Sequence, residues 1–204
     1  MYIVIEGQDA TGKTTQVELL AEYLRKKTGK KVVTINEPDG DIESAHALHD
    51  IIVGKHYELL PFTQILLLTA SRLELWKKIA EPVLKEGGIV VASRNWWSSL
   101  AYQGYGQGVS RSRITRLTKE LLPEQYIHPD KGVILTLSDE VRIARQTGRD
   151  DNSKKDFFES KPLDFQHKVN HGYLRIAKDF NIPTFDASPS IEEIHTELIK
   201  LFGL

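Results

Sequence analysis

Residues 7–14, GQDATGKT, fit the pattern G-x-x-x-x-G-K-T and directly follow the apolar run of residues 2–5. Such a loop joins a buried strand to a helix, because its glycines allow backbone N–H groups to turn toward phosphate oxygens. The helix that follows adds unpaired N–H groups and the positive end of its dipole. In this arrangement Lys13 can reach the β- and γ-phosphates, and the Thr14 hydroxyl can bind Mg²⁺. We therefore predict a strand, a phosphate-binding loop (P-loop) and a helix at the start of the chain.

Short runs rich in Val, Ile or Leu alternate with segments of helical period along the rest of the chain. The expected strands are residues 2–6, 31–35, 89–92, 132–137 and 183–185, and the expected helices are residues 13–28, 62–86, 112–122, 139–147, 164–180 and 191–202. Strands that alternate with helices form a parallel sheet wound on both faces. We predict an α/β fold in one domain over residues 1–204: a three-layer P-loop sandwich with five parallel strands and helices on both faces.

Sheets of this kind bind ligands beyond the carboxyl ends of their strands. This rule predicts that residues 7–14, 37–39, 93–95 and the segment after Leu137 meet at one edge. Residues 147–162 are charged and poor in aliphatic side chains, which predicts a loop between two helices. We expect a short mobile lid over about residues 148–162, since P-loop proteins often close over their nucleotide. An ordinary surface loop is the alternative, in which Lys154 and Lys155 are solvated charges.

The composition limits the partners of the chain. A formal net charge of −1 argues against a general nucleic-acid binder, which is usually basic. The sequence contains no cysteine, which excludes disulfides and thiolate metal sites and fits a cytoplasmic location. The N-terminus enters a strand at once, and no segment has the roughly eighteen uninterrupted apolar residues of a membrane span. We expect neither a nucleic acid nor a membrane as a partner.

Further motifs follow the predicted strands in an order that resembles the thymidylate kinase family. That family carries a P-loop of the form G-x-D-x-x-G-K-[ST]-T, then E-P-G-G, A-x-R, D-R-Y, S-x-x-A-Y-Q-G and P-D. The matched positions are Gly7, Asp9, Gly12, Lys13, Thr14, Thr15, Glu37, Pro38, Gly40, Ala70, Arg72, Arg94, Ser98 or Ser99, Ala101, Tyr102, Gln103, Gly104, Pro129 and Asp130. The resemblance runs from residue 2 to about residue 180, and its A-Y-Q-G block is more specific than the P-loop.

The resemblance implies transfer of the γ-phosphoryl group of ATP to the 5′-phosphate of dTMP, with Mg²⁺ as the metal and a homodimer as the assembly. Lys13 and the loop backbone would hold the donor phosphates, and Thr14 would bind the metal. The implied nucleotide-binding residues are Gly7, Gln8, Asp9, Ala10, Thr11, Gly12, Lys13, Thr14, Thr15 and Arg145. Some members carry an arginine at the position of Ala10, and others place it in the lid, where Arg149 is available. Such an arginine contributes about 10³–10⁵ in rate.

The acceptor side is implied in the same way. Arg94 would clamp the acceptor phosphate, because a guanidinium matches the geometry of phosphate. Asp9 would accept a hydrogen bond from the 3′-hydroxyl, and Arg72 and Gln103 would recognise the pyrimidine. The implied substrate-binding residues are Asp9, Glu37, Leu68, Arg72, Arg94, Ser99, Tyr102 and Gln103, and the implied catalytic residues are Lys13, Arg94, Arg149 and Asp9.

The chain departs from the family pattern at four positions. Ser93 replaces the acid of D-R-Y, Asn36 replaces an arginine, and Leu68 replaces the aromatic residue that stacks on thymine. His49 aligns with an arginine of the next helix, so one contact to the acceptor phosphate is expected to be weaker or pH-dependent. A serine cannot supply the negative charge that commonly holds Mg²⁺ at this strand end. We expect Glu37 or Asp39 to substitute for it.

These departures leave several functions open. The chain could be an active kinase with dTMP or another nucleotide as acceptor, a nucleoside kinase whose acceptor is a hydroxyl, or a nucleotide-binding regulatory protein with weak activity. Several other side chains also have plain structural interpretations. Trp96 and Trp97 are core or interface anchors as readily as base-stacking groups, and Tyr105 is expected to pack. Trp76 is expected to be exposed, as a weak hint of the dimer interface. The pair His167 and His171 is expected to be structural rather than metal-binding.

Overall fold

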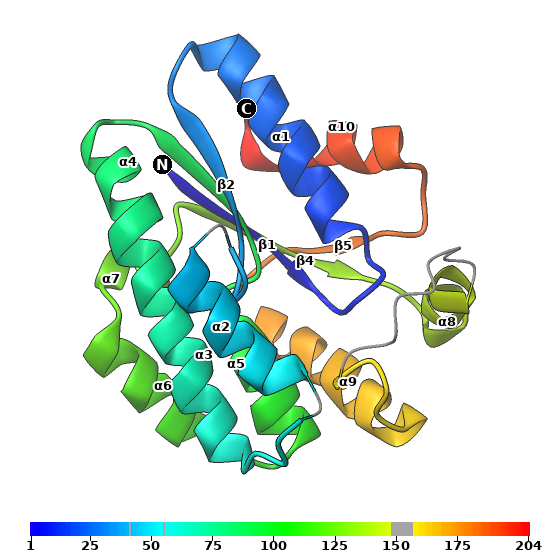
Figure 1. Ribbon diagram of the computed structural model, residues 1–204. Helices are drawn as coiled ribbons and strands as arrows, with labels where there is room; N and C mark the ends of the chain where they lie inside the picture. Colours follow the sequence, from blue (N-terminus) through cyan, green and yellow to red (C-terminus); the bar gives the residue numbers. More distant parts are fainter. Residues whose placement is uncertain (41, 55, 148–156) are drawn as a thin grey trace.

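The computed structural model describes residues 1–40, 42–54, 56–147 and 157–204, and its centre is a parallel sheet (Figure 1). The strands are β1 (Tyr2–Gly7), β2 (Val32–Asn36), β3 (Ile89–Ser93), β4 (Lys131–Thr136) and β5 (Thr184–Asp186), in the order β2-β3-β1-β4-β5. In the register, Ile5 of β1 lies opposite Ser93 of β3 and Val133 of β4. The carboxyl ends of the three central strands therefore lie at one edge of the sheet, with β3 ending two residues before β1. The predicted five-stranded parallel sheet is confirmed.

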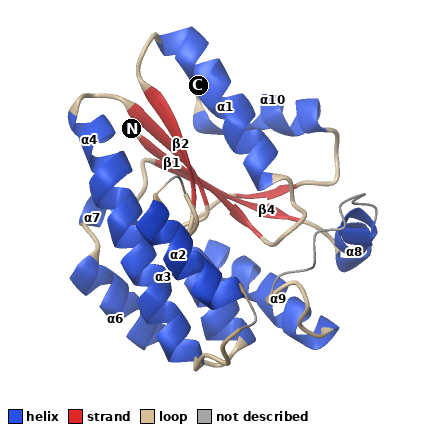
Figure 2. Ribbon diagram, viewed as in Figure 1, coloured by secondary structure: helices blue, strands red, loops and turns tan. Residues whose placement is uncertain are grey.

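Successive side chains of each strand enter the two layers of the core in turn, because strand side chains alternate between the faces of a sheet. Ile3 and Ile5 pack against α1 (Lys13–Thr28) and α10 (Ile191–Phe202), whereas Tyr2 and Val4 pack against the helices of the other face. Those helices include α3 (Pro61–Leu75), α4 (Glu81–Lys85) and α9 (Leu163–Asp179) (Figure 2). The sandwich of three layers thus follows from the period-2 pattern of the strands.

Helices α1, α8 (Asp139–Thr147) and α10 begin and end at the predicted residues. Helix α6 (Arg111–Leu121) and α9 are each shifted by one residue from the expected bounds. Three helical segments were not predicted: α2 (Glu43–Val53), the stretch of α5 (Trp97–Ser99) and the π-helix η2 (Leu100–Gly106), and the short α7 (Glu124–Ile127). Helix α2 buries only Ala45 and Ile52.

Glycines weaken the helical signal of η2, and the packing of η2 requires them. A Cβ atom on Gly106 would lie 2.5 Å from the Phe165 ring of α9, and one on Gly172 would lie 2.9 Å from the Tyr105 ring. Helices η2 and α9 therefore approach more closely than side chains at these positions would allow.

The single long helix predicted over residues 62–86 is divided in the structure. A π-helical turn, η1 (Trp76–Ala80), separates α3 from α4, and the Glu81 N–H donates to the carbonyl of Trp76 five residues earlier. Pro82 follows directly and has no N–H to donate, and wide turns of this kind accommodate such a break. The expectation that Trp76 is exposed is wrong: it is 3% exposed, and its ring packs edge-on against Tyr2 and Tyr126 with centroids 5.3 and 5.5 Å away.

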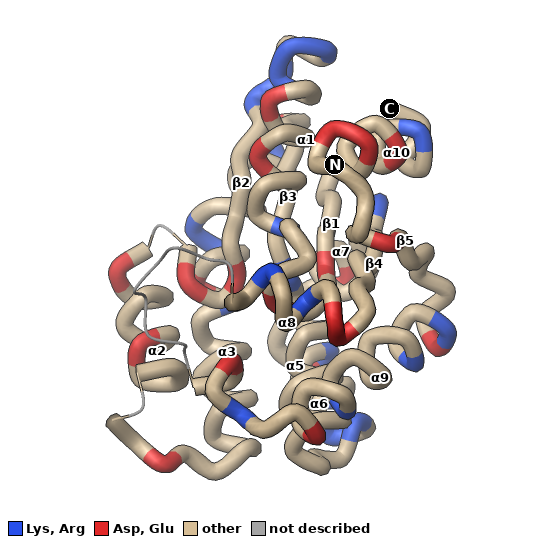
Figure 3. The backbone as a smooth tube through the Cα atoms, turned by 90° about the vertical axis from the view of Figure 1, so that its right-hand side faces the viewer, with Lys and Arg blue, Asp and Glu red and all other residues tan. Residues whose placement is uncertain are grey.

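Acidic and basic residues are distributed along the whole chain, and basic residues occupy the end of α1 (Figure 3). Arg25, Lys26 and Lys27 occupy the last turn of α1, where positive charge complements the helix dipole. No helix among the described residues is both long enough and apolar enough to span a membrane.

Candidate active site

The loop between β1 and α1 has the backbone geometry that its glycines predict. Gly12 caps α1 with φ 84°, in the left-handed region, and Ala10 also adopts a left-handed φ of 70°. Gly7 has φ 145°, and a Cβ atom there would lie 2.4 Å from the carbonyl oxygen of Leu135 in β4. A side chain at position 7 would push the loop away from the sheet, so the first glycine of the motif serves close packing as well as flexibility.

A pocket of about 360 Å³ opens at the carboxyl ends of the strands, next to this loop. All eight predicted substrate-binding residues line it: Asp9, Glu37, Leu68, Arg72, Arg94, Ser99, Tyr102 and Gln103. The loop contributes Ala10, Gly12, Lys13, Thr14 and Thr15 as well. The expectation that Lys13 and Arg94 face one site is therefore met. Gly7 and Gln8 are not among the lining residues, and the Gln8 amide instead donates to Gln166 Oε1 (2.8 Å).

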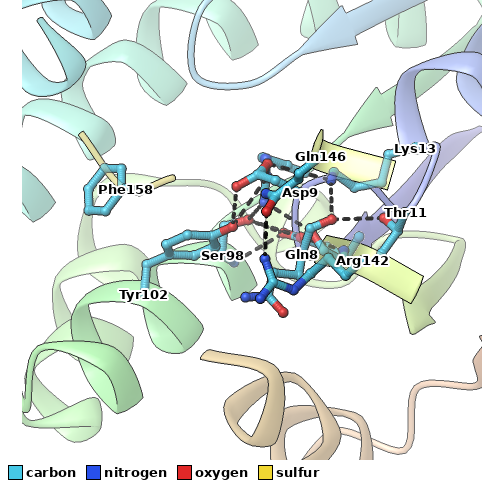
Figure 4. A network of polar contacts seen from close by, with 12 residues as sticks. Gln8, Asp9, Thr11, Lys13, Ser98, Tyr102, Arg142, Gln146 and Phe158 are labelled. Atoms are coloured by element: carbon cyan, nitrogen blue, oxygen red, sulfur yellow. Dashed lines mark hydrogen bonds and ion pairs between the residues drawn. The ribbon is translucent and has the colours of Figure 1, made fainter. Parts of the chain in front are cut away.

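Asp9 joins the two cations of the pocket. Its Oδ1 forms an ion pair with Arg94 and lies 4.0 Å from Lys13 Nζ, while Tyr102 OH donates to Oδ2 (2.8 Å). Lys13 and Tyr102 point toward Asp9 from opposite sides (Figure 4). Burial alone would raise the pKa of Asp9, but Arg94 and Lys13, with the Tyr102 hydrogen bond, outweigh it and lower the pKa to about 2. Asp9 is thus ionised at neutral pH.

Arg94 is fixed by both its backbone and its side chain. It follows β3 with φ 71°, an uncommon conformation for a residue with a Cβ atom. Its Nη1 donates to the carbonyl of Gly7 (3.1 Å), to Ser98 Oγ (3.1 Å) and to Tyr173 OH (3.0 Å). Although burial opposes its charge, Asp9 helps to keep the pKa of Arg94 well above its usual value. This guanidinium is a permanent, oriented cation at the strand end.

Glu6 is a second buried acid beneath Arg94, and sequence reasoning missed it. Its Oε1 accepts from the N–H groups of Asn95 (2.8 Å) and Ser98 (3.0 Å), and its Oε2 accepts from Tyr173 OH (3.0 Å). These bonds hold the segment after β3 against β1 and orient two hydroxyls that accept from Arg94. A charged residue inside a run of buried apolar residues was the available signal, because such groups are buried only when they are bonded.

Arg72 belongs to a third buried network rather than to an exposed helix face. Its guanidinium donates to Glu37 Oε2 (3.1 Å), Ser99 Oγ (2.7 Å) and the carbonyl of Asn95 (3.0 Å). Tyr126 OH also donates to Glu37 Oε2 (2.6 Å). Burial raises the pKa of Glu37 to about 7, although Arg72 and the Tyr126 hydrogen bond oppose the rise. The Glu37 carboxyl at the wall of the pocket therefore has a pKa close to neutral pH.

Gln103 and Leu68 form the inner wall near Arg72. The Gln103 Nε2 donates to Gln64 Oε1 (3.3 Å), whereas its Oε1 is buried without a hydrogen-bond partner among the described residues. A buried acceptor of this kind is costly unless a donor reaches it. Phe158 lies beside Tyr102, with ring centroids 5.4 Å apart, and lines the same pocket. This end of the pocket therefore combines apolar walls with an acceptor and a cation.

Thr14 and Ser93 lie where a metal beside the loop would bind. Both line the pocket, and the Ser93 Oγ is buried without a hydrogen-bond partner among the described residues. Hydroxyl oxygens suit Mg²⁺ or the water around it, so these residues fit the metal that the P-loop implies. Neither residue carries charge.

The remaining predicted residues lie outside the main pocket. Thr11 and Arg145 line a neighbouring pocket of about 410 Å³, together with Ser190 and Ile191 at the start of α10. Arg145 donates to the carbonyl of Ala187 (2.8 Å). Arg149 and most of the expected lid, residues 148–156, are outside the described residues.

The tryptophan and histidine side chains whose roles the sequence left open contact other side chains of the protein. Trp96 and Trp97 are 1% and 4% exposed and belong to the core, which excludes them as base-stacking groups. His167 Nδ1 lies 2.6 Å from Asp139 Oδ2, and the His171 ring packs at the edge of Tyr105. His49 lines the pocket 3.7 Å from Asp39 Oδ1, an oxygen that also pairs with His46 Nδ1 at 2.5 Å.

Comparisons with known proteins find relatives along the whole chain. A family model described as Thymidylate kinase matches residues 5–198. A protein named thymidylate kinase from Kosmotoga olearia is 34% identical over 206 residues, which cover 100% of this chain and 96% of the relative. Another, from Caldicellulosiruptor saccharolyticus, is 34% identical over 201 residues, covering 98% and 94%. The crystal structure of thymidylate kinase from Ehrlichia chaffeensis superposes with a TM-score of 0.78 at 30% identity, covering 100% of this chain and 98% of that one. The likeness extends from end to end rather than over the loop alone.

Proposed function

This chain belongs to the thymidylate kinase family, and we propose that it transfers the γ-phosphoryl group of ATP to the 5′-phosphate of dTMP, giving ADP and dTDP. The observation that carries this proposal is the position of two cations, Lys13 and Arg94, on either side of Asp9 in one pocket. Phosphoryl transfer requires two phosphates in line and neutralised charge, with little covalent chemistry for the protein. A pocket with one cation for each phosphate supplies that arrangement.

The donor side is formed by the P-loop. Backbone N–H groups between Gly7 and Thr14 would donate hydrogen bonds to the β- and γ-phosphates, and Lys13 would neutralise their charge. Thr14 would hold Mg²⁺, which when bound draws charge from the phosphate oxygens during transfer. Thr11 of the P-loop, Arg145 and Ser190 line the neighbouring pocket. This pocket would hold the adenosine end of ATP.

The acceptor side is formed by Arg94, Asp9 and the inner wall of the pocket. Arg94 would bind the 5′-phosphate, and Asp9, ionised and oriented, would accept from the sugar hydroxyl. Arg72 uses three of its five N–H donors within the protein, so it retains donors for a carbonyl of the base. The unpartnered Gln103 Oε1 would accept from a ring N–H. Thymine and uracil offer an N–H between two carbonyls, whereas cytosine has no such N–H.

The contacts of Arg94 with Asp9 and its other partners would favour binding of the acceptor phosphate. Arg94 is preoriented by five partners before any phosphate reaches it, so little conformational entropy is lost when the acceptor binds. The buried setting strengthens its interaction with a dianion relative to water. Arg149, outside the described residues, would complete the charge neutralisation from the segment before α9.

A coupled assay of ADP release tests the proposal. We expect turnover with dTMP to exceed turnover with dUMP, UMP, CMP and dGMP. Replacing Arg94 by alanine is expected to lower kcat/KM for dTMP by at least about 10³, the order found when a phosphate-binding arginine is lost. The matched control is Arg175→Ala on α9, an exposed residue outside the pocket, which should leave kcat/KM within twofold of the parent, about 0.4 kcal/mol.

The alternatives make different predictions in the same assay. A nucleoside kinase would phosphorylate thymidine and would tolerate Arg94→Ala, because its substrate has no phosphate to clamp. A regulatory protein would be stabilised by ATP in a melting experiment but would turn over none of the five nucleotides. Either result would contradict the proposed reaction.

We also propose a homodimer and a cytoplasmic location, both from the family resemblance and the composition. Sedimentation equilibrium measures the first directly, and a mass equal to one chain at micromolar concentration would refute it.

A further inference from the structure

A small side pocket of about 140 Å³ lies next to the P-loop, between α1 and the ends of β2 and β3. Thr14, Glu18, Thr34, Asn36 and Ser93 contribute its polar lining. Ser93 is 1% exposed, and its Oγ is buried without a hydrogen-bond partner among the described residues. The pocket therefore joins the proposed metal-binding hydroxyl of Thr14 to an unsatisfied hydroxyl and to one carboxylate.

The other carboxylates near the loop are already engaged by cations or donors. Asp9 pairs with Arg94 and lies near Lys13. Glu37 is buried against Arg72 and Tyr126.

Asp39 and Glu159 complete the acids of the main pocket, and both take part in other interactions. Asp39 Oδ1 lies 2.5 Å from His46 Nδ1 and 3.7 Å from His49 Nδ1. Glu159 follows the undescribed segment and has a partner of its own. The expectation that Glu37 or Asp39 replaces the acid of the strand end is therefore not favoured by their contacts.

Glu18 differs from these acids. It is exposed, and no hydrogen bond or ion pair to it is found among the described residues. It stands four residues after Thr14 in α1, so the two side chains share one face of the helix. Helical Cα–Cβ bonds tilt toward the N-terminus, which directs Glu18 toward Thr14.

We propose that Glu18 is a positioning residue for the metal: it supplies beside Thr14 the negative charge that a serine at position 93 lacks. The proposal rests on the proposed function only in requiring a Mg²⁺–nucleotide complex at the P-loop. Mg²⁺ in kinases keeps several water ligands, so an exposed carboxylate can act on it through water. The Ser93 hydroxyl would then find its missing partner in the same water.

The test measures ADP affinity by calorimetry as a function of Mg²⁺ concentration, without any acceptor. Glu18→Gln is expected to raise the Mg²⁺ concentration for half-maximal ADP affinity about tenfold, equivalent to ~1.4 kcal/mol. Affinity for ADP in EDTA should stay equal or rise, because the phosphates no longer face a carboxylate. A merely structural role would instead weaken binding in both conditions.

Glu22→Gln is the matched control, since Glu22 is an exposed acid one turn further along α1 that pairs with Lys26 at 2.6 Å. It should leave the Mg²⁺ dependence unchanged. In the double variant Glu18→Gln/Ser93→Asp, an acid at the strand end should restore it. If Glu18→Gln behaves as Glu22→Gln does, the proposal is overturned, whether or not the double variant folds. Because no acceptor is used, failure here is separate from failure to phosphorylate dTMP.

Discussion

The protonation of Glu37 is controlled by its burial in the folded chain. Its pKa rises from 4.5 to about 7 on burial, so the folded chain keeps a proton that the unfolded chain loses. Below about pH 4.5 the carboxyl is protonated in both states. Between pH 4.5 and 7 the unfolded chain binds fewer protons, so the contribution of Glu37 to stability falls as the pH rises. Above pH 7 the cost is constant.

Glu37→Gln isolates this effect, because glutamine has the shape of the protonated acid. We expect the free energy of unfolding of the wild type, minus that of the variant, to fall by ~3 kcal/mol from pH 4.5 to pH 7.5. Urea denaturation at four pH values measures the difference, in which titration of the histidines cancels. A difference that is flat with pH, or that rises, would show that Arg72 keeps the carboxylate ionised throughout.

Single residues were found from the sequence when a motif named them. Arg72 and Arg94 were implied by the A-x-R and D-R-Y motifs of the family, and both line the pocket. Glu6 and Tyr173 were missed because their role is to hold Arg94 and its neighbours through contacts across 167 positions of sequence. Helical period gives the face on which Tyr173 lies, but it does not reveal the partner that this face meets.

At the scale of elements, the path from α3 through η1 to α4 shows how a local break serves packing. Trp76, the first residue of the π turn η1, lies in the core beside Tyr2. The sequence showed the apolar period on both sides of this point. The π turn at residues 76–80 could not be predicted, because the apolar period on both sides of it is that of one regular helix.

Replacing Trp76 by alanine is therefore expected to lower the free energy of unfolding by ~3–5 kcal/mol, the usual cost of truncating a buried aromatic residue. Urea denaturation followed by circular dichroism gives the value. Lys77→Ala, an exposed change on the next residue, should cost less than about 0.5 kcal/mol. Equal stability of both variants would mean that Trp76 is an exposed or interface residue after all.

Some of the other helices could be predicted from the sequence, and others could not. The bounds of α1 and α10 agree with the sequence because both have clear apolar stripes and end at glycines, Gly29 and Gly203. Helices α2 and η2 were missed for opposite reasons. The first buries few residues, and the second carries glycines that favour loops in isolation but allow close approach to α9.

At the scale of the whole molecule, parallel strands bring the separate motifs together. Ile5 lies opposite Ser93, so the ends of β1 and β3 are neighbours at one edge of the sheet. The P-loop and Arg94 therefore come into contact although Gly7 and Arg94 are 87 positions apart in the sequence. The pocket lies where the rule for parallel sheets predicts it, beyond the carboxyl ends of the strands. The ion pairs and hydrogen bonds of Asp9, Glu6 and Glu37 could not be predicted from the sequence, because contacts between distant segments depend on distances that no local pattern specifies.

The most direct test of this account uses a single ligand that joins adenosine and thymidine through five phosphates. Calorimetric titration should show one molecule bound per chain, displaced by ATP and also by dTMP, because Lys13 and Arg94 grip the two ends of one phosphate chain. Lys13→Met and Arg94→Ala should each weaken its binding by about 10² or more, in line with charged hydrogen bonds worth ~1.5–3 kcal/mol each. Displacement by ATP alone, with affinity unaffected by Arg94→Ala, would show that the acceptor binds elsewhere.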